Sequence, residues 1–94
     1  MTKTSYVQGA SDQPLIGATI GGMFDATVLE HAEREALVIP HQNVRWTYRE
    51  LKRRVDDLAA GLMRLGLDPG ERLGIWAPNC AEWTITQFAT AKAG

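Results

Sequence analysis

Cysteine is scarce in this sequence, and long apolar runs are missing. Cys80 is the single cysteine among 94 residues, so no intrachain disulfide can form, and this scarcity suits a reducing, cytoplasmic setting. No apolar stretch approaches the ~20 residues of a membrane-spanning helix, and residues 1–14 lack the apolar centre of a signal peptide. The net charge of −1 gives no reason to expect nucleic acid or an anionic membrane as a partner. The sequence therefore predicts one cytoplasmic globular domain at most.

Motifs that carry chemistry are also missing. His31 and His41 stand far from Cys80 in the sequence, and no histidines, cysteines or paired carboxylates have metal-ligand spacing. The glycines match neither the dinucleotide-binding nor the P-loop pattern. We therefore predict no catalytic, cofactor-binding or metal-binding residue in this chain. Cys80 is assigned to packing, His31 to the negative pole of a helix dipole and His41 to a solvent-exposed loop.

Residues 1–18 show no sustained periodicity, which predicts a flexible N-terminal arm. The folded part is expected to comprise residues 19–94. Its first helix should begin after Thr19 as the N-cap. One face of that helix carries side chains at spacings of three and four, namely Ile20, Met23, Phe24, Thr27, Val28 and His31. Gly21 and Gly22 weaken its first turn, so the helix depends on packing.

Two short apolar stretches predict a β-hairpin. Residues 36–40 (ALVIP) and 44–47 (VRWT) are the expected strands, and Asn43 in the connection tolerates left-handed backbone angles. Pro40 has no N–H group to donate to a ladder, so the hairpin is expected at a sheet edge.

The clearest pattern begins at Thr47, which forms a predicted capping box with Glu50. Glu50 and Arg54 make a favourable i,i+4 pair, and Gly66 is the expected left-handed stop. Between them runs an apolar stripe made of Leu51, Val55, Leu58, Leu62 and Leu65 and widened by Ala59 and Met63. Its burial cannot offset the entropy of ordering the helix, so the stripe is expected to lie on a sheet.

The basic run 52–54 on this helix has two interpretations. A phosphate-binding patch is the first, but Asp56 and Asp57 follow one turn later and neutralise the charge. A solvated helix face is therefore preferred. A dimerising coiled coil would need three to four heptads, and only about two and a half are present.

Residues 71–77 (ERLGIWA) predict a strand that is covered on both faces, as in parallel sheets. Asn79 is the expected cap of a third helix, with Glu82 three residues later. The predicted fold class is α/β: an N-terminal helix, an edge β-hairpin, and a βαβα unit that starts a parallel sheet. A buried helix after a parallel strand should lead to another strand, so we expect residues 19–94 to be an incomplete domain, the N-terminal fragment of a larger α/β domain.

Three ordered segments resemble a known family. Residues 46–51 (WTYREL), then Ala59 and Leu62, then residues 65–75 (LGLDPGERLGI) look like the N-terminal signature of the adenylate-forming, AMP-binding superfamily. Residues 76–83 (WAPNCAEW) and 87–94 are most similar to fatty-acid and related acyl-CoA synthetases. The resemblance covers residues 19–94.

The resemblance implies a parent enzyme that activates a carboxylic acid with ATP and Mg²⁺ and transfers the acyl group to coenzyme A. No position here matches the family's phosphate loop, acyl pocket, ribose-binding aspartate or C-terminal lysine, so no site residue is carried over and this segment alone is expected to be inactive. Its implied role is scaffold, with a core of Leu51, Val55, Leu58, Leu62, Ile75 and Phe88.

The expected partner is the remainder of the parent chain, and self-association through exposed apolar surface, as a homodimer, is a second expectation. Two further alternatives stay open, a peptide-synthetase adenylation domain and a freestanding interaction module.

Overall fold

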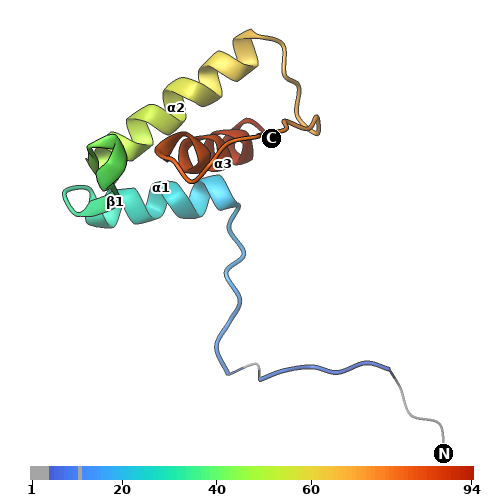
Figure 1. Cartoon of the computed structure of the whole chain (residues 1–94). Coiled ribbons are helices and arrows are strands. Elements are labelled where there is room, and N and C mark those ends of the chain that lie inside the picture. Colours follow the sequence, from blue (N-terminus) through green and yellow to red (C-terminus); the bar gives the residue numbers. More distant parts are fainter. Residues whose placement is uncertain (1–4, 11) are drawn as a thin grey trace, which may run out of the picture.

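The computed structural model describes residues 5–10 and 12–94, which form three helices and a two-stranded hairpin (Figure 1). The elements are α1 (Ile20–His31), β1 (Glu35–Ile39), the 3₁₀ turn η1 (Pro40–Gln42), β2 (Val44–Thr47), α2 (Tyr48–Arg64) and α3 (Ala81–Ala93). Among the described residues, no helix is long and apolar enough to cross a membrane.

The predicted arm lies partly outside the described residues, which begin at Ser5 and omit residue 11. Residues 5–10 and 12–18 are exposed, carry no helix or strand, and run away from the helices (Figure 1). The flexibility of residues 1–18 stays a prediction.

Helix α1 begins where the sequence predicts. The Thr19 hydroxyl oxygen accepts a hydrogen bond from the Gly22 N–H group at 3.0 Å. The predicted apolar face is only half buried, however: Phe24 and Val28 are each 6% exposed, whereas Ile20 is 64% exposed. The apolar spacing was identified correctly, but the described residues do not cover the first turn of this face.

The predicted hairpin is present, but its first strand ends at Ile39 and Pro40 begins the turn η1. Strands β1 and β2 are antiparallel, with Ile39 opposite Val44 and an irregularity in register between Glu35 and Leu37. Asn43 adopts left-handed backbone angles, with φ 55°, which its short polar side chain tolerates.

Both ends of α2 are formed by local sequence. At the start, the Glu50 N–H group donates to the Thr47 hydroxyl at 3.2 Å. The reciprocal half of the capping box was wrong, because the Glu50 carboxylate accepts hydrogen bonds from Arg53 and Arg54 instead. At the end, Gly66 has φ 95°, and the Gly66 and Leu67 N–H groups donate back to the last turn in a Schellman motif.

The stripe of α2 packs on the helices and, through Ala36, Leu37 and Trp46, also against the hairpin. The prediction that it lies on a sheet therefore holds only for these hairpin contacts, and the parallel sheet expected to support it is not formed among the described residues. Leu51 (3% exposed), Val55 (0%) and Ala59 form the core with residues of α1 and α3, namely Phe24, Val28 and Ala89. The predicted core residues Leu58 and Phe88 are partly buried against this cluster, whereas Leu62 and Ile75 lie outside it. Burial ends before the last turn, where Leu65 is 86% exposed. The far end of α2 projects beyond the other helices (Figure 1).

The predicted strand at residues 71–77 is not formed, and the described part of the chain contains no parallel sheet. A strand exists only through a hydrogen-bonded neighbour, and none lies beside this segment. The predicted cap Asn79 was also wrong, since Cys80 occupies the N-cap position of α3 and makes no side-chain capping bond.

Candidate functional site

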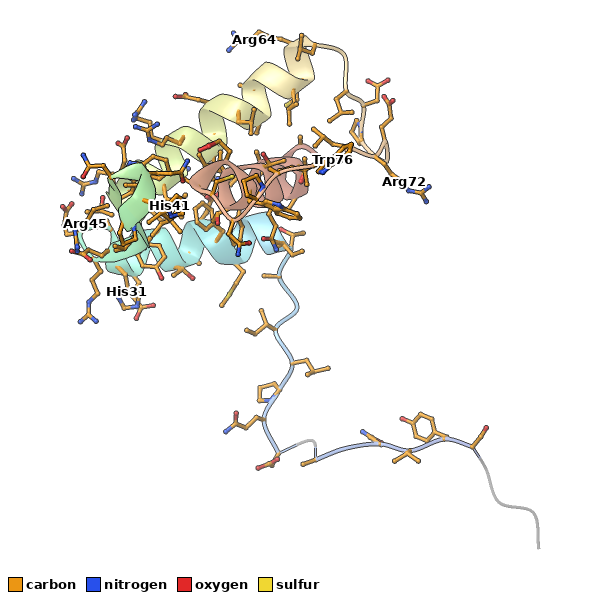
Figure 2. The ribbon with its side chains drawn as sticks, in the orientation of Figure 1. His31, His41, Arg45, Arg64, Arg72 and Trp76 are labelled. Atoms are coloured by element: carbon orange, nitrogen blue, oxygen red, sulfur yellow. The ribbon has the colours of Figure 1, made fainter. Side chains whose placement is uncertain are left out.

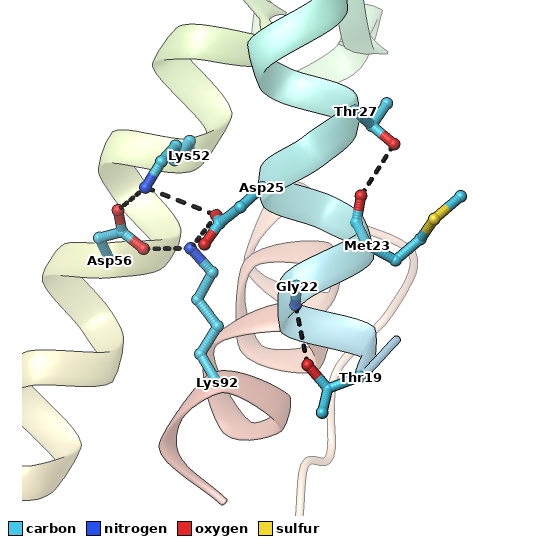
Figure 3. A network of polar contacts seen from close by, with 8 residues as sticks. All are labelled: Thr19, Gly22, Met23, Asp25, Thr27, Lys52, Asp56 and Lys92. Atoms are coloured by element: carbon cyan, nitrogen blue, oxygen red, sulfur yellow. Dashed lines mark hydrogen bonds and ion pairs between the residues drawn. The ribbon is translucent and has the colours of Figure 1, made fainter. Parts of the chain in front are cut away.

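Four charged side chains connect the three helices (Figure 3). The Lys92 ammonium on α3 lies 2.5 Å from Asp25 Oδ1 on α1 and 2.5 Å from Asp56 Oδ1 on α2. Lys52 Nζ lies 2.5 Å from Asp56 Oδ2 and 3.5 Å from Asp25 Oδ1. The two cations and two carboxylates cancel, so this cluster has no spare charge for a ligand and acts as a tie between helices.

The protonation of this cluster follows from its geometry. Burial raises the pKa of Asp56, but the hydrogen bonds and charges of Lys52 and Lys92 outweigh burial and hold that pKa below its ordinary value. The hydrogen bond to Asp56 in turn raises the pKa of Lys52. Near neutral pH, Asp56 is therefore negatively charged and Lys52 is positively charged.

Gly21 lets α1 approach α3 at this cluster. The residue is buried, and a Cβ atom there would lie 3.0 Å from Lys92 Cγ. Sequence reasoning treated this glycine only as a weakness of the helix, because its close neighbour is far along the chain.

The basic run 52–54 is neutralised within α2, as predicted. Lys52 pairs with Asp56 and Arg53 with Asp57. Arg53 and Arg54 also contact Glu50, and the Arg54 guanidinium lies 4.1 Å from the Trp46 ring centroid. These pairs favour the solvated face over a phosphate-binding patch.

The hairpin caps α3 from a distance. The Gln42 side-chain carbonyl accepts a hydrogen bond from the Ala81 N–H group at 2.7 Å, and its amide donates to the Glu82 carboxylate at 2.9 Å. Sequence reasoning missed this contact, because 39 residues separate Gln42 from Ala81 and no local signal joins them.

The structure brings His41 and Cys80 to one surface hollow of about 460 Å³ at the hairpin end. His41 is exposed there, as predicted, and Cys80 is half-buried. No hydrogen bond joins the two among the described residues. His31 lies in the last turn of α1, as predicted, and its ring centroid is 6.5 Å from that of Tyr48. Both histidines are near the hairpin in Figure 2.

An open apolar groove of about 540 Å³ runs between α1, α3 and the hairpin end of α2. Its lining includes Ile16, Ile20, Met23, Tyr48, Leu51 and Phe88. Residues 5–10 and 12–94 contain no group of three or more histidine, cysteine or acidic side chains that could hold a metal ion. The arrangement therefore offers apolar surface and internally paired charges, without a set of reacting groups.

Comparison with known proteins finds a matching family and several similar enzymes. Residues 24–94 match the model of a family described as AMP-binding enzyme. The chain is 48% identical over 90 residues to the mitochondrial medium-chain acyl-CoA ligase ACSF2 of Mus musculus and 47% identical over 90 residues to that of Homo sapiens. It is 39% identical over 92 residues to the acyl-CoA ligase sidI of Beauveria bassiana.

These alignments include 96% to 98% of the chain, which spans only 15% to 16% of the length of the relatives. The predicted cytoplasmic location receives no support from them, because the vertebrate ligases carry the word mitochondrial in their names.

Proposed function

This chain belongs to the AMP-binding enzyme family, and from that premise we propose that it is the N-terminal scaffold segment of an acyl-CoA synthetase. The whole enzyme would join a fatty or other carboxylic acid to AMP, with loss of pyrophosphate from ATP, and then pass the acyl group to the thiol of coenzyme A with release of AMP. The observation that carries this proposal is the 48% identity over 90 residues to a medium-chain acyl-CoA ligase.

The family implies ATP and Mg²⁺, but the described residues of this chain do not fit them. The carboxylates that share Lys92, Asp25 and Asp56, are already paired with Lys52 and Lys92, and no ligand set is assembled among the described residues. We therefore assign no step of the reaction to this segment. Its contribution is the buried packing of α1, α2 and α3 on which further elements of the enzyme rest.

Transfer to coenzyme A is tested by an assay of two polypeptides, the 94-residue chain and the longer ligase that carries it. With ATP, Mg²⁺, coenzyme A and a panel of carboxylic acids, we expect thioester formation by the longer polypeptide and none by the 94 residues. Acyl transfer to a carrier-protein domain in place of coenzyme A would instead support the peptide-synthetase alternative. ATP–pyrophosphate exchange catalysed by the 94-residue chain itself would overturn the scaffold role.

The apolar groove favours a second candidate, a freestanding interaction module. Its lining side chains Ile20 and Met23 are 64% and 43% exposed, which leaves room for a partner. Full activity of the longer ligase with Ile20→Ser, together with loss of a binding partner from the 94-residue chain, would support the module. Loss of ligase stability on the same substitution supports the scaffold.

A further inference from the structure

The apolar groove between α1, α3 and the hairpin end of α2 begins where the N-terminal segment joins α1. Ile16 and Ala18 of that segment already line the groove, together with Ile20 in the first turn of α1. From Ile16 back toward Ser5, the described residues carry no helix or strand and run away from the helices (Figure 1). One end of the groove is therefore already formed by the segment that leads into α1.

Large apolar side chains on both sides of this junction are left in water. Leu15 is 97% exposed and Ile16 is 67% exposed, while Ile20 and Met23 in the groove are 64% and 43% exposed. Removal of apolar surface from water is favourable. A contact between Leu15 and the groove would cover such surface on the segment and on the helices at once.

The groove and the residues beside it are both without charge. No charged side chain lines the groove, and residues 13–18 (QPLIGA) carry none, since Asp12 is the first charged residue before them. A ligand with an ionised group would lose water here without gaining an opposite charge, which is costly. The lining therefore favours a neutral, apolar occupant.

The reach of the segment matches the length of the groove. Leu15 stands three positions before Ala18, and an extended chain advances at most ~3.3–3.6 Å per residue, so Leu15 reaches about 10 Å from Ala18. The lining of α1 extends from Ile20 to Thr27, which is also about 10 Å at ~1.5 Å per residue. Gly17 has nothing within 4 Å of its Cβ position, so the backbone can turn there and bring Leu15 over the groove.

We propose that residues 13–18 are a strap that folds back along α1 and closes this groove, with Leu15 packed against Met23 and Phe88. The structure described above shows the strap open. This inference does not rest on the proposed function, because it uses only residues of this segment and of the three helices.

The tether makes the chain's own strap the occupant, ahead of a second copy. A short flexible connection holds a group near its site at an effective concentration on the order of millimolar, which a second copy reaches only at that protein concentration. An outside partner of the groove would have to displace the strap.

Nuclear magnetic resonance of the full 94-residue chain tests the strap. We expect nuclear Overhauser effects between the methyl protons of Leu15 and Met23, because packed side chains approach within about 4.0–4.5 Å. A mixture of isotope-labelled and unlabelled chains separates contacts within a chain from contacts between chains. Absence of the Leu15–Met23 effect, or its appearance only between labelled and unlabelled chains, would overturn the proposal.

A charge at Leu15 provides a second measurement. Leu15→Asp should open the strap, because an ionised carboxylate in the groove has no partner. The dye ANS, which binds exposed apolar surface, should then fluoresce about twofold or more above the parent chain. The matched control Val7→Asp makes the same change at a side chain that is 91% exposed and lies outside the strap, and its fluorescence should equal that of the parent.

Both variants should keep the helical circular dichroism of the parent, because neither side chain belongs to the core. Equal ANS fluorescence in Leu15→Asp and Val7→Asp would contradict the assignment of the strap to residues 13–18.

Discussion

Glu50 shows how a single side chain can couple stability to pH. Hydrogen bonds from Arg53, together with those from Arg54, lower the pKa of Glu50 from 4.5 to about 2. Because the folded pKa is depressed, this carboxylate contributes stability above pH 4.5 that is lost as the pH falls toward 2.

We expect Glu50→Gln to flatten the acid limb of the stability curve between about pH 4.5 and pH 2, since the variant has no carboxylate to protonate. Urea unfolding at a series of pH values measures this. Glu30→Gln on α1, where the carboxylate is 76% exposed, serves as the control. An unchanged acid limb in Glu50→Gln would show that the arginine contacts do not persist in solution.

Two glycines near the end of α2, Gly61 and Gly66, test how the backbone conformation of a single residue affects stability. Gly66 has φ 95°, and left-handed angles cost about 1–2 kcal/mol for a residue with a side chain. Gly61 is in the helix interior, with nothing within 4 Å of an added Cβ atom. Gly66→Ala should therefore lower the free energy of unfolding by about 1–2 kcal/mol, and Gly61→Ala should raise it by about 0.5–1 kcal/mol. Denaturant unfolding distinguishes the two, and equal effects would contradict the assignment of Gly66 as the helix stop.

At the scale of elements, the start of α3 depends on the hairpin. Gln42→Ala removes the acceptor from the Ala81 N–H group, and Ala81 is 0% exposed. An unpaired buried donor costs about 1–3 kcal/mol, so the variant should lose stability in that range, and the Ala81 amide should exchange faster. The neighbouring His41→Ala change at an exposed position should stay within ~0.5 kcal/mol. Unaltered exchange at Ala81 in Gln42→Ala would refute the long-range cap.

Lys92 tests the tie between the three helices. Its side chain is 12% exposed, whereas those of Asp25 and Asp56 are 47% and 42% exposed. Breaking a buried pair costs about 3–5 kcal/mol and breaking an exposed pair costs about 0–1 kcal/mol. Lys92 is partly buried and its partners are more exposed, so we expect an intermediate loss of about 2 kcal/mol for Lys92→Met.

The matched control is Lys52→Met, at a side chain that is 36% exposed. Asp56 keeps its contact with Lys92 in that variant, so the loss should stay below ~1 kcal/mol. Urea unfolding measures the free energy of unfolding of both variants. An equal loss in the two would mean that the position of Lys92 between α1 and α2 contributes no extra stability.

At the scale of the whole molecule, the tryptophans report which surfaces are covered. Trp76 is fully exposed, Trp83 is 40% exposed, and Trp46 is half-buried beneath Arg54. In variants that keep one tryptophan and carry phenylalanine at the other two positions, acrylamide should quench Trp76 most and Trp46 least. Equal quenching of Trp76 and Trp46 would show that the connecting segment folds onto the helices in the isolated chain.

Local sequence alone determined the elements whose signals are local. Thr19 and Thr47 start helices, Asn43 turns the hairpin and Gly66 stops α2, because each acts on backbone groups a few residues away. The ordered segments in residues 46–75 also identified the family correctly.

Tertiary structure decided which faces are buried and which segments pair. The contact of Lys92 with Asp25 spans 67 residues, and the Gln42 cap and the close approach at Gly21 likewise depend on where α3 lies. Residues 71–77 carry the composition of a buried strand, yet residues 72–77 make no backbone–backbone hydrogen bond within the described chain. Apolar composition indicates only that burial of a segment's side chains is favourable, whereas a strand also requires backbone hydrogen-bond partners on another segment.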